Sequence, residues 1–165
     1  MTYEHIVHGF EPVYDKNSRL LILGSLPSVM SREQNFYYGH PQNRFWKVIA
    51  AITGEALPQT ITEKKELLLR NRIAVWDVIA ECDIEGSSDQ SIKNVVPTDL
   101  SVILRCAPVT AIYTNGSTAS RIYRKYQFPL TGIETVQLPS TSPANAAWSL
   151  DRLIKEWGEK IDAHA

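Results

Sequence analysis

The sequence predicts an α/β fold in which a parallel sheet is covered by helices on both faces. Three observations lead to this prediction. Short apolar runs end at turn residues, as strands buried on both faces do. Segments with the 3.6-residue period of amphipathic helices follow these runs. The two kinds of segment alternate along the 165 residues, which is typical of parallel strands joined by right-handed helical crossovers.

Four apolar runs are expected to form the sheet. They cover residues 19–23, 73–76, 109–113 and 133–138. The residues that stop them are Gly24, Asp77, Thr114 and Pro139. Each run is too short for a helix and has no polar alternation, so we expect strands with neither face exposed to solvent.

Two helices are expected between the first and second strands. One apolar face is formed by Phe45, Val48, Ile49 and Ile52, at the i, i+3, i+4, i+7 spacing. Thr60 and Glu63 form a capping-box pattern ahead of the three leucines at 67–69. Arg70 lies where the negative end of that helix dipole would be.

Two further helices are expected on either side of the third strand. Thr98 is the expected cap of a helix that carries Leu100 and Ile103. Ser117 is the expected cap of a helix that carries Ile122 and Tyr126. Residues 81–94 contain Gly and Ser and are expected to form one long surface loop.

The last helix has the clearest start signal. Ser142 is expected at its N-cap and Pro143 at its first position. Its buried stripe would consist of Ala147, Leu150, Ile154, Trp157 and Ile161.

Composition and charge exclude several classes of protein. Hydrophobic residues make up 44% of the chain and charged residues 21%, which excludes a disordered or fibrous protein. The formal net charge is -1, so binding to nucleic acid would require a local positive patch. Cys82 and Cys106 are expected to be buried and reduced, and they cannot form a thiolate metal site alone. No stretch reaches the roughly 20 apolar residues of a membrane span, so we expect a soluble, cytoplasmic protein.

Common catalytic motifs are absent from the sequence. It has no phosphate-binding G-x-x-x-x-G-K-[ST], no dinucleotide G-x-G-x-x-G and no hydrolase G-x-S-x-G. The four histidines lack paired metal-ligand spacing except for His5 and His8, which lie near an end expected to be mobile, so no metal site is expected. The expected crevice is therefore uncharged, with amide, hydroxyl, aromatic and backbone groups that can hold a planar ligand and a water.

The ligand crevice of a parallel sheet lies beyond the carboxyl ends of its strands. Here those ends carry residues 24–28, 77–78, 115–117 and 139–143. The last of these segments is expected to open onto a helix N-terminus, which attracts phosphate. The polar and aromatic residues at 36–44 follow the first strand and should reach the same rim.

Five segments in order carry a family resemblance. They are GSLPS at 24–28, YYGHPQNRFW at 37–46, VWDV at 75–78, TNG at 114–116 and LPSTSP at 138–143. Together they resemble the hypoxanthine (deoxyinosine) branch of the uracil-DNA glycosylase superfamily. The resemblance spans most of the chain, and the tract at 37–46 is its most specific part.

The resemblance implies a three-layer α/β/α sandwich with a four-stranded parallel sheet, as a single domain over residues 1–165. It implies a monofunctional DNA glycosylase that needs no metal or cofactor. Such an enzyme flips a deaminated base out of double-stranded or single-stranded DNA and hydrolyses its N-glycosidic bond. Fixed donors and a positioned water can supply the catalysis. We also expect a monomer with no obligate protein partner and no association with membranes.

The resemblance also assigns residues to roles. Asn43 would be the catalytic residue, its amide orienting the attacking water or the scissile bond. The base pocket would consist of Gly24, Ser25, Leu26, Tyr38, Gly39 and Asn115. The DNA backbone would be held by Ser28, His40, Arg44, Ser140, Thr141 and Ser142.

Structural roles are open for the same residues. Asn43 and Ser142 are also good helix caps, and an aromatic residue such as Tyr38 more often packs in a core. Asn115 and Asp77 end strands, where local hydrogen bonds explain polar side chains nearly as well as pocket contacts do.

The chain departs from the uracil-specific members at two motifs. Their first motif has an aspartate or asparagine that assists the water, whereas this chain has Gly-Ser-Leu-Pro-Ser. Their last motif begins with a histidine, whereas this chain has Leu138. The departures fit a purine leaving group, and the resemblance makes hypoxanthine the expected base. Uracil and xanthine specificity, and a non-enzymatic α/β module that binds a nucleotide or a partner, stay open as alternatives.

The residue that fills the vacated base stack is not identified by the motifs. The last motif lacks a large apolar side chain for this purpose. Arg44, Tyr37 and the residues at 86–94 are the candidates.

Overall fold

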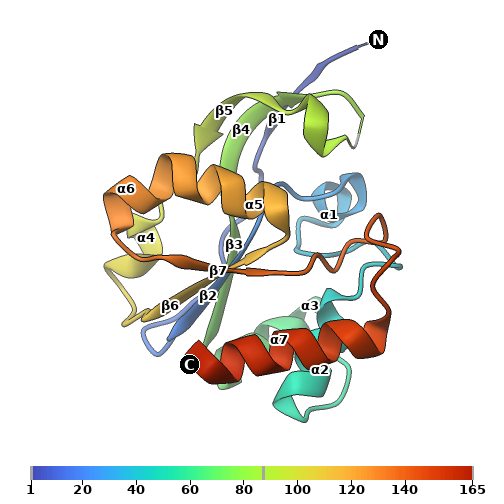
Figure 1. Cartoon of the computed structure of the whole chain (residues 1–165), viewed down its shortest axis with the longest axis vertical. Coiled ribbons are helices and arrows are strands. Elements are labelled where there is room, and N and C mark those ends of the chain that lie inside the picture. The colour runs from blue at the N-terminus through green and yellow to red at the C-terminus, as the bar shows by residue number, and fades with distance from the viewer. Residues whose placement is uncertain (1, 87, 165) are drawn as a thin grey trace.

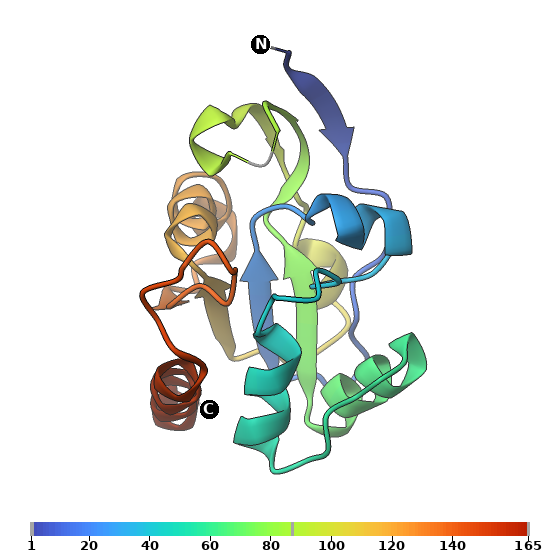
Figure 2. The ribbon, with the colours of Figure 1, turned by 90° about the vertical axis from the view of Figure 1, so that its right-hand side faces the viewer.

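Two sheets form the framework of the protein. The computed structural model describes residues 2–86 and 88–164. Four strands form a parallel sheet in the order β3-β2-β6-β7, and three form a smaller antiparallel sheet in the order β1-β4-β5. In Figure 2 the parallel strands point toward the smaller sheet, which therefore lies beyond their carboxyl ends.

The parallel sheet confirms the predicted architecture. Its strands are β2 (Leu20–Gly24), β3 (Ile73–Asp77), β6 (Ala111–Asn115) and β7 (Thr135–Leu138). Helices α2 (Phe45–Thr53), α3 (Ile61–Arg70) and α7 (Leu150–His164) lie on one side of it in Figure 1. Helices α4 (Ser101–Leu104), α5 (Ser117–Ile122) and α6 (Phe128–Thr131) lie on the other. A π-helical segment, η2 (Tyr123–Gln127), joins α5 to α6.

The central strand shows why an uninterrupted apolar run folds this way. Leu20 and Ile22 of β2 belong to the hydrophobic cluster that includes Phe45 and Trp157. Leu21 and Leu23, whose side chains point to the opposite face, belong to the cluster that includes Ile122. Burying each such side chain contributes about 1.5–3 kcal/mol, so both faces of the strand stabilise the layers.

The predicted capping box at the start of α3 forms with a shift of one residue. Thr60 Oγ1 accepts a hydrogen bond of 3.1 Å from the Glu63 amide. Glu63 Oε1 accepts from the amide of Gln59, at 2.9 Å, rather than from that of Thr60. The helix start is nevertheless where the sequence predicts it.

The predicted surface loop at 81–94 is wrong. Strand β4 (Ile79–Ile84) continues through its first residues, and β5 (Lys93–Pro97) begins at its end. Cys82 and Ile84 are buried while Glu81 and Asp83 are partly exposed, so β4 has the two-residue period of a half-buried strand. Between the two strands a 3₁₀ turn, η1 (Asp89–Ser91), is part of the connection.

The N-terminal segment is part of the fold, contrary to the expectation of a mobile end. Strand β1 (Glu4–Val7) pairs antiparallel with β4, and Ile6 packs in the hydrophobic core. The His8 amide then donates to the carbonyl of Ala80. A short helix, α1 (Val29–Gln34), follows β2 and also was not predicted.

The start of the last helix differs from the prediction. Helix α7 begins at Leu150, and Ser149 Oγ accepts a hydrogen bond from the Arg152 amide at 3.2 Å. Ser142 instead accepts from the Ala144 amide in a turn. The buried stripe consists of Leu153, Trp157 and Ile161, whereas Ala147 is exposed. Ser140–Ser142 therefore lie in a loop and not at a helix N-terminus.

Three smaller expectations also fail. Thr98 Oγ1 is buried without a hydrogen-bond partner, and Asp99 accepts from the Ser101 amide at the start of α4. Ser117 is the first residue of α5 and forms no side-chain cap. Cys106 is exposed, whereas Cys82 is buried as expected, and neither forms a disulfide. None of the described helices is long and apolar enough to cross a bilayer.

Candidate active site

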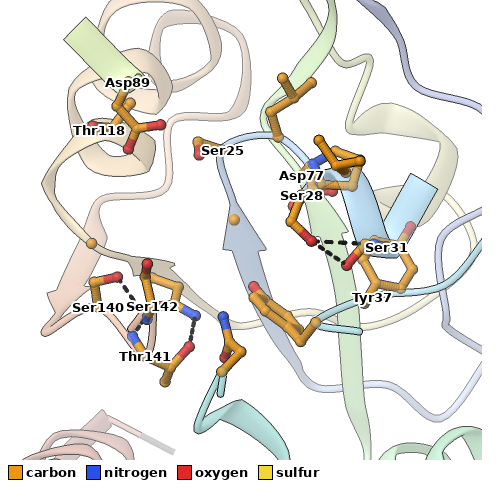
Figure 3. Close-up of a pocket in the computed structure, with 18 of the residues that line it drawn as sticks. Ser25, Ser28, Ser31, Tyr37, Asp77, Asp89, Thr118, Ser140, Thr141 and Ser142 are labelled. Atoms are coloured by element: carbon orange, nitrogen blue, oxygen red, sulfur yellow. Dashed lines mark hydrogen bonds between the residues drawn. The ribbon is translucent and has the colours of Figure 1, made fainter. Parts of the chain in front are cut away.

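A cavity of about 270 Å³ lies at the carboxyl ends of the parallel strands. Its lining comes from the segments after β2, β3, β6 and β7, from α1, and from the connection between β4 and β5. Figure 3 shows Ser140, Thr141 and Ser142 on one side and Ser28, Ser31, Tyr37 and Asp77 on the other. The cavity is thus the crevice that the strand order predicts.

Gly24 allows the polar groups of the cavity to approach the backbone of β2. A Cβ atom at this position would lie 2.5 Å from Asp77 Oδ1 and 2.9 Å from the Tyr38 hydroxyl oxygen. The parallel register brings Asp77 there, because Gly24 is paired with Asp77 across β2 and β3. Two polar oxygens, one a carboxylate and one a hydroxyl, therefore flank a single point above Gly24.

Asp77 is a charged residue in a cavity that the sequence predicts to be uncharged. Its Oδ2 lies 2.8 Å from His8 Nε2, and the two side chains are only 4% and 6% exposed. Its Oδ1 accepts no hydrogen bond from the described residues. Arg32 and Asp89 also line the cavity, and Arg32 Nη1 is buried without a partner. The expectation of an uncharged crevice is wrong.

Tyr38 has an uncommon backbone conformation and an unpaired hydroxyl. Its φ of 54° lies in the left-handed region, and its ring stacks on that of Phe45 with centroids 3.9 Å apart. The hydroxyl oxygen is buried without a hydrogen-bond partner. Burial, assisted by the charge of Asp77, raises the pKa of Tyr38 well above its usual range. The hydroxyl is therefore protonated at neutral pH and can donate to a ligand.

Asn43 lines the cavity and also accepts a hydrogen bond at the start of α2. Its Oδ1 accepts a hydrogen bond of 2.9 Å from the amide of Phe45, the first residue of that helix. No described residue bonds to its Nδ2. The N-cap position of α2 belongs to Arg44, so Asn43 is not the N-cap that the sequence allowed but the residue before it. Its amide nitrogen remains available to a ligand in the cavity.

Asn115 uses both ends of its carboxamide to hold the loop after β7. Its Nδ2 donates to Thr141 Oγ1 at 3.0 Å, and its Oδ1 accepts from the Thr141 amide at 3.1 Å. Thr141 is fully buried by these contacts. Asn115 therefore lines the cavity with a side chain whose main contacts are structural.

Arg44 holds the same loop from the other side. Its guanidinium donates to the backbone carbonyls of Thr141, Ser142, Asn145 and Trp148. Three of these carbonyls also accept from backbone amides, including that of Arg44 to Thr141, and the guanidinium adds contacts that tie the loop to the start of α2. Arg44 does not line the cavity.

Most of the predicted site residues come together in the structure. Those that line the cavity are Asn43, Gly24, Ser25, Leu26, Tyr38, Asn115, Ser28, Ser140, Thr141 and Ser142. Gly39, His40 and Arg44 do not line it. The Gly39 amide donates to Ser31 Oγ, and His40 Nδ1 accepts from the Gln42 amide, so both shape the loop before α2.

The sequence reasoning missed His8 and left a pocket contact of Asp77 open without assigning it a role. The signal for Asp77 was present, because it ends a strand at the predicted crevice. No comparable signal exists for His8, which reaches Asp77 only through the unpredicted pairing of β1 with β4. Tyr37 is 1% exposed and its hydroxyl donates to the Glu11 carbonyl, so it cannot fill a vacated base stack. In residues 2–86 and 88–164, no three His, Cys, Asp or Glu side chains are grouped to hold a metal ion.

Comparisons with known proteins agree with the geometry. The model of the family "Uracil DNA glycosylase superfamily" matches residues 11–160. A hypoxanthine DNA glycosylase of Methanosarcina acetivorans is 40% identical over 156 residues, which cover 92% of this chain and 96% of that protein. A hypoxanthine DNA glycosylase of Methanosarcina barkeri is 37% identical over 152 residues, 92% of this chain and 95% of that protein.

A solved structure gives the same fold. It is the solution NMR structure of a protein from Methanosarcina acetivorans, described as a candidate uracil DNA glycosylase. The TM-score is 0.79 at 37% sequence identity, and the match covers 92% of this chain and 93% of that chain. The parallel sheet and its two helical layers are therefore shared with a relative of known structure.

Proposed function

This chain belongs to the uracil DNA glycosylase superfamily, and we propose from this that it releases hypoxanthine from deoxyinosine in DNA by hydrolysing the N-glycosidic bond. The observation that carries the proposal is a pair of oxygens beside Gly24 in the lining of the cavity. The Tyr38 hydroxyl is buried without a partner, and Asp77 is held by His8 through Oδ2, which leaves Oδ1 for a ligand.

The two oxygens match the edge of a deaminated base. Hypoxanthine carries a ring N–H next to a carbonyl oxygen, which are a donor and an acceptor side by side. A carboxylate accepts from the ring N–H, and a tyrosine hydroxyl donates to the carbonyl. Adenine presents the reverse order, with a ring nitrogen that accepts and an amino group that donates. The Asp77 carboxylate would therefore repel adenine and bind hypoxanthine, which separates the lesion from the normal base.

We assign the hydrolytic step to Asn43. Water attacks C1′ of the sugar and gives up one proton, while the C1′–N9 bond breaks and its electron pair leaves with the base. The base takes up one proton, so the products are free hypoxanthine and an abasic sugar. Because Asn43 Oδ1 is fixed by the Phe45 amide, the carboxamide has one orientation. Its free Nδ2 hydrogens and the second lone pair of Oδ1 can hold the water or the sugar without rearrangement, which is the basis of electrostatic preorganisation.

The decisive experiment is a panel of duplexes with one modified nucleotide each. Purified protein is incubated with duplexes that carry deoxyinosine, deoxyuridine or deoxyxanthosine opposite each normal base, and with unmodified DNA. Free base is measured by chromatography, and abasic sites by strand cleavage after alkali. We expect hypoxanthine release to be fastest and adenine release to be undetectable.

Uracil is the second candidate base, because the solved relative is described as a candidate uracil DNA glycosylase. Uracil has the same ring N–H next to a carbonyl, so Asp77 and Tyr38 do not distinguish it by hydrogen bonding alone. Faster release of uracil than of hypoxanthine would assign the chain to that activity. Binding of all duplexes without release of any base would favour the non-enzymatic alternative.

A further inference from the structure

Three cations stand together on α5 and the π-helical segment that continues it. Arg121, Arg124 and Lys125 are all exposed. In the part of the chain that the structure describes, none of them lies within 4.0 Å of a carboxylate oxygen. The formal charge of the whole protein is only -1, so this cluster is a local excess of positive charge.

The cluster lines a shallow groove that adjoins the cavity. The other groups of the groove are the side chains of Ser117, Thr118 and Gln137, which are neutral hydrogen-bond donors. Ser117 and Thr118 line both the groove and the base cavity. The two are joined because α5 starts two residues after β6 ends, at the rim formed by Asn115 and Gly116. A chain of phosphates leaving the cavity past Ser117 would reach the three cations next.

The spacing along the helix suits a DNA strand. From Ser117 to Lys125 the helix rises by about 12 Å at about 1.5 Å per residue. Successive phosphates of one strand of B-DNA are about 3.4 Å apart along the axis, so this length corresponds to roughly three or four phosphates. The three cations lie at the end of this length away from the cavity, so the nearer phosphates would contact Ser117 and Thr118 and the following ones the cations.

We propose that this basic groove, formed by Ser117, Thr118, Arg121, Arg124, Lys125 and Gln137, binds phosphates of the DNA strand next to the flipped nucleotide. The inference rests on the proposed function, because it takes the cavity as the seat of the base. The contacts are to the backbone, so they position the strand and carry no sequence information.

The test is the salt dependence of binding to undamaged duplex DNA. In the variant Arg121→Gln/Arg124→Gln/Lys125→Gln, the slope of log affinity against log salt should become shallower by about two to three units, at about 0.9 per lost phosphate contact. Between 50 and 200 mM salt, the wild type should therefore lose roughly 20- to 60-fold more affinity than the variant. Dissociation constants are measured by fluorescence anisotropy, and thermal unfolding confirms that the variant is folded.

A matched control removes the same charge from the opposite edge of the sheet. Lys16, Arg19 and Arg72 are exposed and lie before the amino ends of β2 and β3. The variant Lys16→Gln/Arg19→Gln/Arg72→Gln has the same net charge as the first variant, and its slope should equal that of the wild type. A wild-type slope in the groove variant, or an equal loss in both variants, would overturn the proposal.

The readouts separate this inference from the proposed function. Binding to undamaged DNA does not require release of a base. A protein that releases hypoxanthine but keeps its salt slope in the groove variant has the proposed activity and a different DNA surface. If the wild type releases no base but the groove variant has the shallower slope of log affinity against log salt, the protein has the proposed DNA surface without the proposed activity.

Discussion

His8 Nε2 lies 2.8 Å from Asp77 Oδ2, in a pair whose side chains are almost completely buried. His8 follows the N-terminal strand, and Asp77 ends the edge strand of the parallel sheet, so the pair joins the two sheets directly at the cavity. Because one carboxylate oxygen is held by the imidazole, the other faces the cavity in a fixed position. The small antiparallel sheet thus supports the site as well as the fold.

Replacement of Asn43 should separate its two roles. Asn43→Asp keeps the Oδ1 that accepts from the Phe45 amide at the start of α2 but lacks the amide hydrogens, so stability should change little. We expect the rate of base release to fall by about 10²- to 10³-fold, as when one fixed donor is removed. Asn43→Ala should lose the same activity and also about 0.5–2 kcal/mol of stability. Single-turnover release and thermal unfolding measure the two effects, and full activity in Asn43→Ala would exclude a catalytic role.

Asp77→Asn should weaken the selection of the base. The carboxamide has a similar shape, but it can donate as well as accept, so it no longer opposes the adenine edge. Release of hypoxanthine should fall by roughly 10- to 100-fold, since a hydrogen bond to a charged group contributes about 1.5–3 kcal/mol. Competition by duplexes with an unpaired adenine should increase. If neither the rate of hypoxanthine release nor the inhibition by adenine duplexes changes, the carboxylate does not contact the base.

Gly24→Ala should disturb the cavity without removing the sheet. The new Cβ would lie 2.5 Å from Asp77 Oδ1 and 2.9 Å from the Tyr38 hydroxyl, so these groups must move. We expect a loss of about 1–3 kcal/mol in stability, with a loss of base release in the folded fraction. Gly9→Ala is the matched control, because no atom lies within 4 Å of its added Cβ. Equal activity of the two variants would contradict the assignment of the base to this point.

Arg44→Met should loosen the loop that carries Ser140–Ser142. The guanidinium donates to four backbone carbonyls. Loss of these hydrogen bonds should lower the free energy of unfolding by about 2–4 kcal/mol. Hydrogen exchange at the amides of residues 141–148 should become faster, and unfolding should occur at a lower temperature. If the variant instead keeps its stability and loses only affinity for DNA, Arg44 contacts the phosphate backbone as the family resemblance suggested.

The pairing of β1 with β4 should depend on pH through His5. Hydrogen bonds that the His5 imidazole donates to Asp83, and then to Glu81, raise the pKa of His5 above its usual value of 6.5. A raised pKa means that the charged form stabilises the fold, so the stabilisation is complete below about pH 6.5 and is lost as the pH rises through the higher folded value. Thermal unfolding of wild type and His5→Gln at pH 5.5 and 8.5 should show a difference only at the lower pH. A constant difference would mean that the imidazole charge is not involved.

The apolar runs were enough to predict the four parallel strands. Strands such as β2 are buried on both faces, so a continuous apolar run identifies them without knowledge of which strands they pair with. The antiparallel strand β4 was missed because its alternating pattern, with buried Cys82 between partly exposed Glu81 and Asp83, has few strongly apolar residues. With β4 assigned to a loop, β1 had no partner, and the contact between His8 and Asp77 could not be predicted.

The motifs predicted where polar residues gather but not what each of them holds. Ser142 and Pro143 have the local signature of a helix start, yet Arg44 binds the carbonyls of the segment and keeps it in turns until Ser149. Such a contact, between residues about a hundred positions apart, leaves no trace in the local sequence. Asn115 was likewise predicted to line the pocket, but its two hydrogen bonds to Thr141 could be found only from the structure.

The neighbours Asn43 and Arg44 link two loops at the start of α2. One side chain faces the cavity, and the other grips the segment whose hydroxyl groups lie along the cavity rim. A DNA strand that displaces this segment on binding would shift the backbone of Arg44. The carboxamide of the preceding residue, Asn43, would then shift as well. Binding of the DNA and alignment of the Asn43 carboxamide would then be coupled. A duplex that binds incorrectly would not align the carboxamide, and its base would not be released.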